Sequence, residues 1–537
     1  MLSYRSGLFV PFFVLCLVPA GVVFGQEGQR QQRSGSLSQD DTSQSIKAFT
    51  TIYSAVEENF ADKIDPDQAI YKGTIPGMLR ELDPHSNFMD PKAWAATRED
   101  ERAQYFGVGM EVGQHYNKVT VIHAFEGSPA YRAGLRPGDA IVAVDGKDAV
   151  GLTVTDVAGL LRGPRGTKVT ITVERKGTNP VTLDVVRDSI ARSCVPQAFW
   201  FKPGIAYVSI SAFMCETTSR DLEASLKQLG ENEITGLILD LRGNPGGLVN
   251  EGVEVAGHFL KKNDLVVSLR GRSQPNKNYN ATVGNGGHEY PIVVVVNGSS
   301  ASASEIVTGA LQDHDRAWVL GETTFGKGLA QSVFPLSHDT GLALTTAHYY
   351  TPSGRLIQRD YTNISFLDYY YHTGGDQKNT SDVKTTDSGR TVYGGGGITP
   401  DEKYAAPKLN QFQIAVLRQG SFFDFSAVYF GPRADVHLPK GWAPDDSVVN
   451  QFHDSLLKSG VMFTEVEFTA NYQWVKDQLK REMYVTAFSY EQSTRVAIEQ
   501  DPEIAAAADA MPKAVSLLQN AKKLIVQRMN AQPRLGR

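Results

Sequence analysis

Residues 291–314 read PIVVVVNGSSASASEIVTGALQDH, and this stretch decides the fold. It begins with a continuously apolar run, continues through a loop of small residues and ends in a helical pattern. Residues 236–247, GLILDLRGNPGG, open in the same way. Continuously apolar strands followed by crossovers are typical of buried parallel sheets. The region 205–360 is therefore predicted to be an α/β domain.

The composition of the whole chain excludes several protein classes. At roughly 150 residues per domain, 537 residues correspond to three or four domains. Hydrophobic residues make up 41% and charged residues 21%, so a large core can form and disorder is not the main state. A net charge of −6 is too weak and too acidic for a nucleic-acid binder. Three cysteines exclude a disulfide-rich scaffold and a multi-cysteine metal site.

The first 25 residues have the layout of a secretory signal peptide. Arg5 gives a positive start, residues 8–24 are almost wholly apolar, and Val23 and Gly25 are small enough for a cleavage site. The apolar stretch is at the short end for a membrane span. We predict a cleaved signal (1–25) and a periplasmic or secreted protein, with an uncleaved membrane anchor as the alternative. The polar, low-complexity residues 26–44 are predicted to form a flexible linker.

Residues 45–104 are predicted to form a helical N-terminal region. Its apolar residues recur with a helical period on one face: Ile46, Phe49, Ile52, Tyr53 and Val56. Further along, Cys194 and Cys215 flank a predicted hairpin that turns at residues 202–204. An oxidising compartment would permit a disulfide between them, and two separate buried thiols are the equal alternative.

Residues 105–188 alternate short strands with two short helices, as expected of a compact module. The segment AGLRPGDAIVAVDG at 133–146 resembles the signature of PDZ domains. A loop resembling their carboxylate-binding loop comprises Gly107, Val108, Gly109 and Met110. Backbone N–H groups in such a loop capture a terminal carboxylate while the peptide adds a strand at the sheet edge. A dinucleotide-binding interpretation of the glycines fails, because no βαβ unit follows.

The core that contains this α/β region is predicted to span 189–361 and 397–405. The polar, Gly-rich residues 362–396 between these parts are predicted to be a mobile insertion. Residues 406–537 are predicted to be a helix-rich C-terminal region to which the sequence assigns no function.

The candidate chemistry lies in two loops. Ser302 stands between a buried strand and a helix, where N–H groups and the helix dipole favour a developing oxyanion. The alternative is a helix cap, because Ser302 and Glu305 form a capping-box pattern. Lys327 lies between glycines among apolar residues; burial there would let it act as a neutral base, and a solvated loop lysine is the alternative. No HExxH, CxxC, GxxxxGK[ST] or GxSxG motif is present.

The motifs together resemble the carboxyl-terminal processing peptidases, also called tail-specific proteases. The resemblance covers residues 45–360 and 397–402, with 25 positions between the serine and the lysine. Besides the PDZ signature, the matching segments are, in order, DPHSNFMDP (83–91), LDLRGNPGG (239–247), SASASEI (300–306), GETTFGKGLAQ (321–331), YYTPSGRLIQ (349–358) and GITPDE (397–402).

This resemblance implies an α/β and α+β multidomain protein with a PDZ domain inserted next to a core of the ClpP/crotonase-like type. It implies a serine endopeptidase with a Ser–Lys dyad, in which Ser302 is the nucleophile, Lys327 the general base and Gln331 a supporting residue. The oxyanion hole would use the backbone N–H groups of Ala303 and of the Gly246-Gly247 turn. Lys327 and Gln331 stand about 13 Å apart on a regular strand, so the backbone must bend if they meet.

The resemblance further implies substrates with unstructured, apolar C-termini and no cofactor or metal. Arg162 matches a position implicated in gating of the PDZ domain, and Asp313 matches an acidic position that we interpret as structural. An adaptor protein or a second copy of the chain remains open as a partner. The alternative function is a catalytically inactive periplasmic scaffold or tail-binding chaperone, and a third hypothesis is another acyl-transferring hydrolase.

Overall fold

The computed structural model describes residues 39–531, except for 102–103, 192, 274, 363, 372–381 and 432–437. The predicted signal peptide and residues 26–38 of the predicted linker lie outside this range, whereas residues 39–44 form the first turns of a helix. Among the described residues, none of the helices combines the length and the apolar character that a bilayer span requires.

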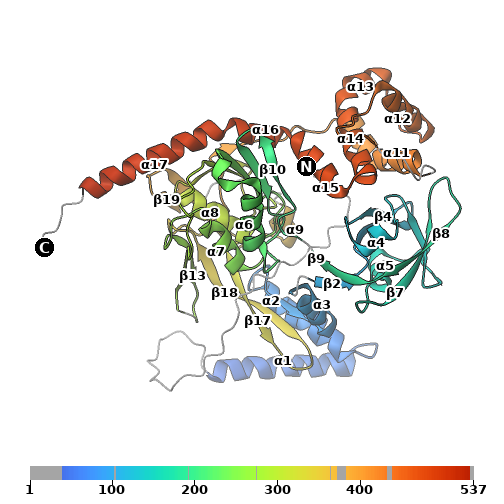
Figure 1. Cartoon of the computed structure of the whole chain (residues 1–537). Helices are drawn as coiled ribbons and strands as arrows, with labels where there is room; N and C mark the ends of the chain where they lie inside the picture. The colour runs from blue at the N-terminus through green and yellow to red at the C-terminus, as the bar shows by residue number, and fades with distance from the viewer. Residues whose placement is uncertain are drawn as a thin grey trace.

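A six-stranded sheet forms the centre of the molecule, in the order β10-β11-β12-β15-β16-β21 (Figure 1). β11, β12, β15, β16 and β21 run parallel, and β10 is antiparallel to β11. Every residue of β12 and β15 is buried, which confirms the α/β domain predicted from their apolar runs. The strands are β10 (Gln197–Lys202), β11 (Ile205–Ser209), β12 (Gly236–Asp240), β15 (Ile292–Val296), β16 (Ala317–Gly321) and β21 (Glu402–Lys403).

Helices cover both faces of this sheet. One face packs against α6 (Thr218–Leu229), α7 (Val249–Gly257) and α8 (Ala303–Asp313) in the largest apolar cluster. The other packs against α15 (Tyr490–Glu499), α16 (Pro502–Asp509) and the start of α17 (Met511–Ala531). The sequence predicted the C-terminal region (406–537) as a unit separate from the core. In the structure its last helices pack on the central sheet and belong to the core. α17 then runs on past the sheet (Figure 1).

A second sheet joins the N-terminal region to the core. β18 (Gly341–Tyr350) pairs with β17 (Leu329–Pro335) and also, at its two ends, with β1 (Asn87–Met89) and β13 (Leu265–Arg270); β14 (Lys277–Asn280) extends the sheet beyond β13. The N-terminal helices are α1 (Gln39–Asn59), the π-helix η1 (Gln68–Thr74), α2 (Ile75–Arg80) and α3 (Pro91–Glu101). The predicted helix at the start of this region is therefore present, but most of its apolar face is exposed to solvent, for example Ile46 and Ile52.

The predicted PDZ module has an apolar core of its own. β3 is the edge of its main sheet, in the order β3-β4-β5-β7-β8, and α5 packs beside β3. The elements are β2 (Gln104–Gly107), β3 (Met110–His115), β4 (Lys118–Ala124), α4 (Pro129–Arg132), β5 (Ala140–Val144), β6 (Lys147–Asp148), α5 (Val154–Leu161), β7 (Lys168–Glu174), β8 (Val181–Val186) and β9 (Asp188–Ala191).

The C-terminal helices before α15 form a fourth apolar core. They are α10 (Gln411–Arg418), α11 (Ser421–Phe430), α12 (Asp446–Lys458), α13 (Glu465–Ala470) and α14 (Tyr472–Ala487). This unit contacts the PDZ module, because the Asp424 carboxylate accepts hydrogen bonds from His115 (3.1 Å), Tyr116 (2.8 Å) and Lys176 (2.7 Å).

Two expectations about local structure are resolved here. The predicted hairpin forms, as β10 and β11, and the cysteines that flank it, Cys194 and Cys215, are joined by a disulfide. The expected mobility of 362–396 is wrong for the described part of that segment, which folds onto the core. This part of the segment forms α9 (Phe366–Tyr371), β19 (Val383–Thr385) and β20 (Thr391–Tyr393). Elsewhere, the short helix η2 (Glu231–Glu233) lies between α6 and β12.

Candidate active site

Ser302 occupies the turn between β15 and α8, as the sequence predicts. Its backbone has φ 56° and ψ −114°, a conformation that is costly for a residue other than glycine. The side chain is 0% exposed at the N-terminal end of α8, where the helix dipole is positive. Strain at such a turn is typical of functional positions, and here it coincides with the predicted nucleophile.

Glu305 joins this turn to the loop that carries Lys327. Its Oε2 accepts hydrogen bonds from the backbone N–H groups of Ser302 and Lys327, both at 2.8 Å. Its Oε1 accepts from the Gly326 N–H (2.6 Å) and the Thr324 hydroxyl (2.5 Å). One oxygen therefore holds Ser302 and Lys327 side by side, although 25 positions separate them in sequence.

Burial is the largest influence on Glu305. It raises the pKa of the carboxyl above its ordinary value, and the hydrogen bonds from its four donors oppose that effect. The three backbone N–H groups and the Thr324 hydroxyl all donate, so both oxygens of the Glu305 carboxyl accept hydrogen bonds. The capping-box alternative for Ser302 is therefore present in part, because Glu305 does bind the Ser302 N–H. The same carboxylate also organises the candidate site.

Lys327 precedes β17 and is buried, so the alternative of a loop lysine in water is wrong. The backbone of its loop is held on both sides by the core. The Phe325 N–H donates to the Ser300 carbonyl (2.9 Å), and the Gly328 N–H donates to Gln358 Oε1 (2.9 Å). A lysine amine inside such a loop has few ways to move, which suits a positioned proton acceptor.

Gln331 is buried on β17, and the strand pairing shifts its register between Ala330 and Gln331. This shift is an irregularity of the strand between Lys327 and Gln331, where a bend is needed only if the two side chains meet. Gln331 Nε2 donates to the carbonyl of His85 at 2.6 Å. This bond brings the DPHS segment of the N-terminal region (83–86) to the candidate site.

The two small-residue loops meet beside Ser302. The carbonyl of Asn244 accepts from the Ala301 N–H (2.9 Å) and the Ser304 hydroxyl (3.0 Å). Asn244 Oδ1 accepts from the Gly246 N–H at 2.9 Å. The predicted oxyanion donors need correcting at this point, because the Gly246 N–H is already used. Among the hydrogen bonds of the described residues, none engages the N–H of Gly247 or Ala303.

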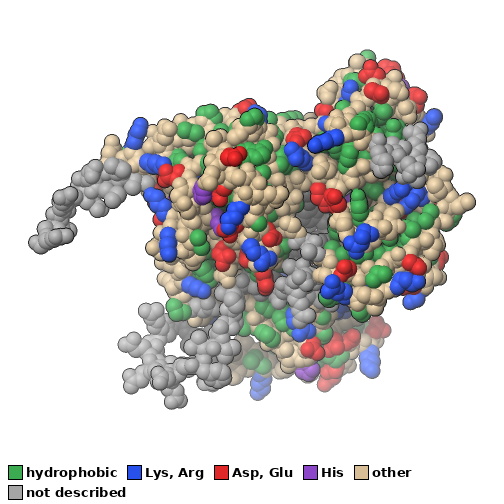
Figure 2. Space-filling view, in the orientation of Figure 1, with side chains coloured by type: hydrophobic (Ala, Val, Ile, Leu, Met, Phe, Trp, Pro, Cys, Tyr) green, Lys and Arg blue, Asp and Glu red, His purple; other side chains and the backbone are tan. Residues whose placement is uncertain are grey.

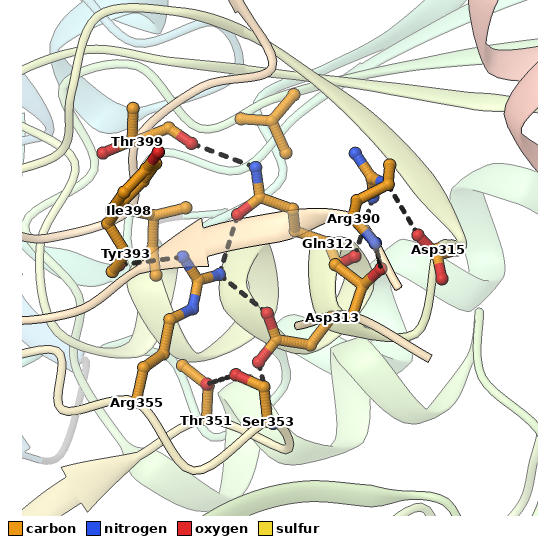
Figure 3. Close-up of polar contacts among 12 residues, drawn as sticks. Gln312, Asp313, Asp315, Thr351, Ser353, Arg355, Arg390, Tyr393, Ile398 and Thr399 are labelled. Carbon is orange, nitrogen blue, oxygen red and sulfur yellow. Dashed lines mark hydrogen bonds and ion pairs between the residues drawn. The ribbon is translucent and has the colours of Figure 1, made fainter. Parts of the chain in front are cut away.

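The far end of α8 is anchored by a buried polar network (Figure 3). Asp313 accepts from Arg355 Nη2 (2.8 Å) and from the Ser353 N–H (3.0 Å), and the same Arg355 nitrogen donates to Gln312 Oε1 (2.7 Å). Arg390 donates to Asp315 Oδ1 at 2.7 Å and joins the segment after β19 to this network. Asp313 is thus placed at the opposite end of α8 from Ser302.

Comparisons with known proteins match the core and the PDZ module to two separate families of domain. The model of peptidase family S41 matches residues 204–364, and a PDZ model matches residues 125–175. A carboxy-terminal-processing protease of Bartonella bacilliformis is 39% identical over 326 residues, covering 60% of this chain and 74% of that protein. The chain belongs to the carboxy-terminal processing proteases of family S41. It is therefore a serine peptidase with a PDZ domain, and the predicted family and fold class are confirmed.

Other carboxy-terminal processing proteases are similar over comparable lengths. The carboxyl-terminal-processing protease of Synechocystis is 37% identical over 292 residues, covering 53% of this chain and 68% of that protein. Among solved structures, a photosystem II D1 C-terminal processing protease is 29% identical, with a TM-score of 0.35, covering 66% of this chain and 86% of that one.

The PDZ residues predicted from sequence lie together at one end of the β3 edge. Gly109 has φ 77°, and a Cβ there would stand 2.5 Å from the Ser128 Cβ, so this position requires glycine. Val108 and Met110 are buried, and Gly107 ends β2. Arg162 caps the C-terminus of α5 with an exposed side chain, on the helix that flanks β3.

Sequence reasoning missed three residues of this protease site. Glu305 was seen only as a capping partner, and its Ser-x-x-Glu spacing was the available signal. His85 stood in a quoted motif without a role. Tyr369, whose hydroxyl lies 2.9 Å from His85 Nε2, gave no signal, because it belongs to the segment predicted to be mobile.

Gly246→Ala is expected to lower kcat/KM by about 10²-fold, because displacing reacting groups by 1 Å has that cost. A Cβ on Gly246 would stand 2.7 Å from the Ser302 Cβ and 2.9 Å from the Ala303 nitrogen. Gly243→Ala is the matched control: it also has positive φ, but its Cβ would meet nothing within 4 Å. Equal activity of the two variants in a peptide-cleavage assay would contradict this account of the turn.

Proposed function

We propose that this protein is an endopeptidase that binds protein C-terminal tails through its PDZ domain and cleaves near the C-terminus with a Ser302–Lys327 dyad. The observation that carries the proposal is the shared contact of Glu305, whose Oε2 binds the N–H groups of both residues. An inactive scaffold would have no need of this arrangement, which favours the enzyme over that alternative.

In the proposed mechanism, the neutral Lys327 amine takes the proton of the Ser302 hydroxyl as Oγ attacks the scissile carbonyl carbon. The oxygen of the tetrahedral intermediate accepts hydrogen bonds from the N–H groups of Ala303 and Gly247. Lys327 then gives its proton to the leaving amine, and an acyl-enzyme on Ser302 remains. Water, deprotonated by Lys327, hydrolyses that ester and restores the serine. Gln331 is proposed to support Lys327.

Tail capture is proposed to occur at the edge of β3. A peptide added there as a strand, between β3 and α5, would end at the loop of residues 107–110, where backbone N–H groups bind its carboxylate. Acidic and basic side chains intermingle on the face drawn in Figure 2, so no field of a single sign steers substrates on that face. Selection is then left to the tail's carboxylate and its apolar side chains.

Access to Ser302 requires movement, since this residue is fully buried. We propose that the PDZ domain takes part in opening the site when a tail binds, with Arg162 at the end of α5 as one contact. Export by a cleaved signal peptide is proposed on the N-terminal sequence, and the protein's place of action is then the periplasm or the exterior. Homo-oligomers or an adaptor remain proposed partners.

The test is cleavage of one unstructured peptide with an apolar C-terminus, supplied with either a free carboxylate or a C-terminal amide. Mass spectrometry identifies the cut sites and gives kcat/KM for each peptide. We expect the amide to lower kcat/KM by about 10- to 100-fold, because charge-assisted hydrogen bonds to the carboxylate are lost. Equal cleavage of both peptides would refute tail recognition, and cleavage of neither would refute the proposed peptidase activity on such tails.

A further inference from the structure

Two neighbouring tyrosines of α9 enclose the imidazole of His85. The Tyr369 hydroxyl lies 2.9 Å from His85 Nε2, and the Tyr370 hydroxyl lies 3.4 Å from Nδ1. His85 and Tyr369 are both buried. More than 280 positions of sequence separate His85 from each tyrosine. The described part of the 362–396 segment therefore packs against the DPHS segment (83–86), which also contacts Gln331.

The donors and acceptors of this cluster allow one consistent assignment. The Tyr370 O–H donates to the Pro84 carbonyl (3.2 Å), so its oxygen accepts from His85 Nδ1–H. In a neutral ring Nε2 is then the acceptor, so the Tyr369 O–H donates to it while the Tyr369 oxygen accepts from Gln358 Nε2 (3.0 Å). We therefore assign His85 as the neutral tautomer with its proton on Nδ1.

The electrostatic surroundings of His85 point the same way. Burial is the largest cause that holds the pKa of His85 well below its ordinary value, and the positive charges of Lys327, when that amine is protonated, and of Arg359 act in the same direction. The Arg359 guanidinium lies 4.3 Å from the Tyr369 ring centroid. Among the described residues, the carboxylate bonded to His85 is that of Asp83, which accepts from the His85 backbone N–H rather than from the ring.

This cluster is bonded at two points to the chain that follows Lys327. Gln358 Oε1 accepts from the N–H of Gly328, the next residue after Lys327 (2.9 Å). Three residues further on, the His85 carbonyl accepts from Gln331 Nε2 (2.6 Å). The series Gly328–Gln358–Tyr369–His85–Gln331 therefore fixes the segment that begins directly after the lysine.

We propose that Tyr369 is a positioning residue for Lys327, acting through Gln358 and His85 and keeping His85 in its neutral, Nδ1-protonated form. The inference rests on the proposed role of Lys327 as general base. The hydroxyl of Tyr369 binds both of these partners, Gln358 and His85. Removing that hydroxyl breaks the series at its midpoint and leaves the Gln358 amide and the His85 ring without their shared contact.

The test is Tyr369→Phe, which removes the hydroxyl and keeps the ring over Arg359. We expect kcat to fall about tenfold with KM within about twofold, since the lysine is displaced while the tail-binding groove is untouched. Tyr472→Phe is the matched control: it also loses a hydrogen-bonded hydroxyl, to Asp446, on the exposed C-terminal helices. It should keep native kinetics and a native melting temperature.

A spectroscopic readout separates positioning from general loosening. In protein labelled with ¹³C at histidine Cε1, the His85 resonance, assigned by its loss in His85→Gln, should titrate at a lower pH than an ordinary histidine. In Tyr369→Phe its titration should move to a higher pH, because a hydrogen bond donated to the neutral ring is lost. Native kcat, or an unchanged His85 resonance, in Tyr369→Phe would overturn the inference. If instead the dyad assignment were wrong, variants of Ser302 or Lys327 would retain activity.

Discussion

Ser302→Ala is expected to lower kcat/KM for a tailed peptide by at least about 10³-fold, because removing a nucleophile leaves only the contribution of substrate binding and the oxyanion donors. The variant should fold normally. The contact of residue 302 with Glu305 uses the backbone N–H, which alanine retains. Its melting temperature and its binding of a tail peptide should therefore match those of the native protein.

Lys327→Met tests the other member of the proposed dyad, because methionine fills similar space and cannot accept a proton. We expect a loss of about 10²- to 10⁴-fold, the usual contribution of a general base. The matched controls are Ser299→Ala, an exposed serine in the same loop as Ser302, and Lys262→Met, an exposed lysine. If either dyad variant kept native activity while folded, or if Ser299→Ala lost activity to the same degree, the assignment of the dyad would be wrong.

The strand–loop–helix units could be predicted because their signals are local, whereas the pairing of Ser302 with Lys327 was implied by the family resemblance. An apolar run identifies a strand that is buried on both faces, and the spacing of two short motifs carries the family resemblance. A parallel sheet also needs cover on both faces, and the crossover helices α6, α7 and α8 cover only one. α16 and the start of α17, from the region to which the sequence assigns no function, help to cover the other.

The residues around Lys327 could not be found in this way, because their relationship is entirely tertiary. His85 and Tyr369 meet only after the N-terminal region pairs with β18 and the segment after residue 362 folds back. Composition predicted a mobile insertion there, since polar and glycine-rich residues favour solvation. Composition does not show that the tyrosines at 369 and 370 pack against the buried His85.

Both N–H groups of the Gly246-Gly247 turn were predicted as oxyanion donors, and one of them is already bonded in the structure. A glycine pair predicts a tight turn, and the sequence does not say which N–H group remains available. In the structure the side chain of Asn244 takes the Gly246 N–H, since the asparagine must satisfy its own buried amide. The remaining candidates are Gly247 and Ala303, which is a sharper hypothesis than the sequence allowed.

The second large effect is expected on stability, at the end of α8 opposite Ser302. Asp313 and Arg355 are both about 1% exposed and form a buried ion pair in the network of Figure 3. Asp313→Ala leaves the Arg355 guanidinium buried without its counter-charge. We therefore expect the free energy of unfolding to fall by about 3–5 kcal/mol, measured by urea-induced unfolding. The exposed pair Arg495–Glu499 is the control, and breaking it should cost less than about 1 kcal/mol.

Removing both charges distinguishes an ion pair from a general packing defect. In the double variant Asp313→Leu/Arg355→Met no unpaired charge remains, so we expect it to be more stable than Asp313→Ala. Catalysis offers a second measure. The backbone of α8 runs from Ser302 to Asp313, so loosening its far end should lower kcat in Asp313→Ala even below the temperature at which it unfolds. A double variant as unstable as Asp313→Ala would mean that shape, and not charge pairing, anchors the helix.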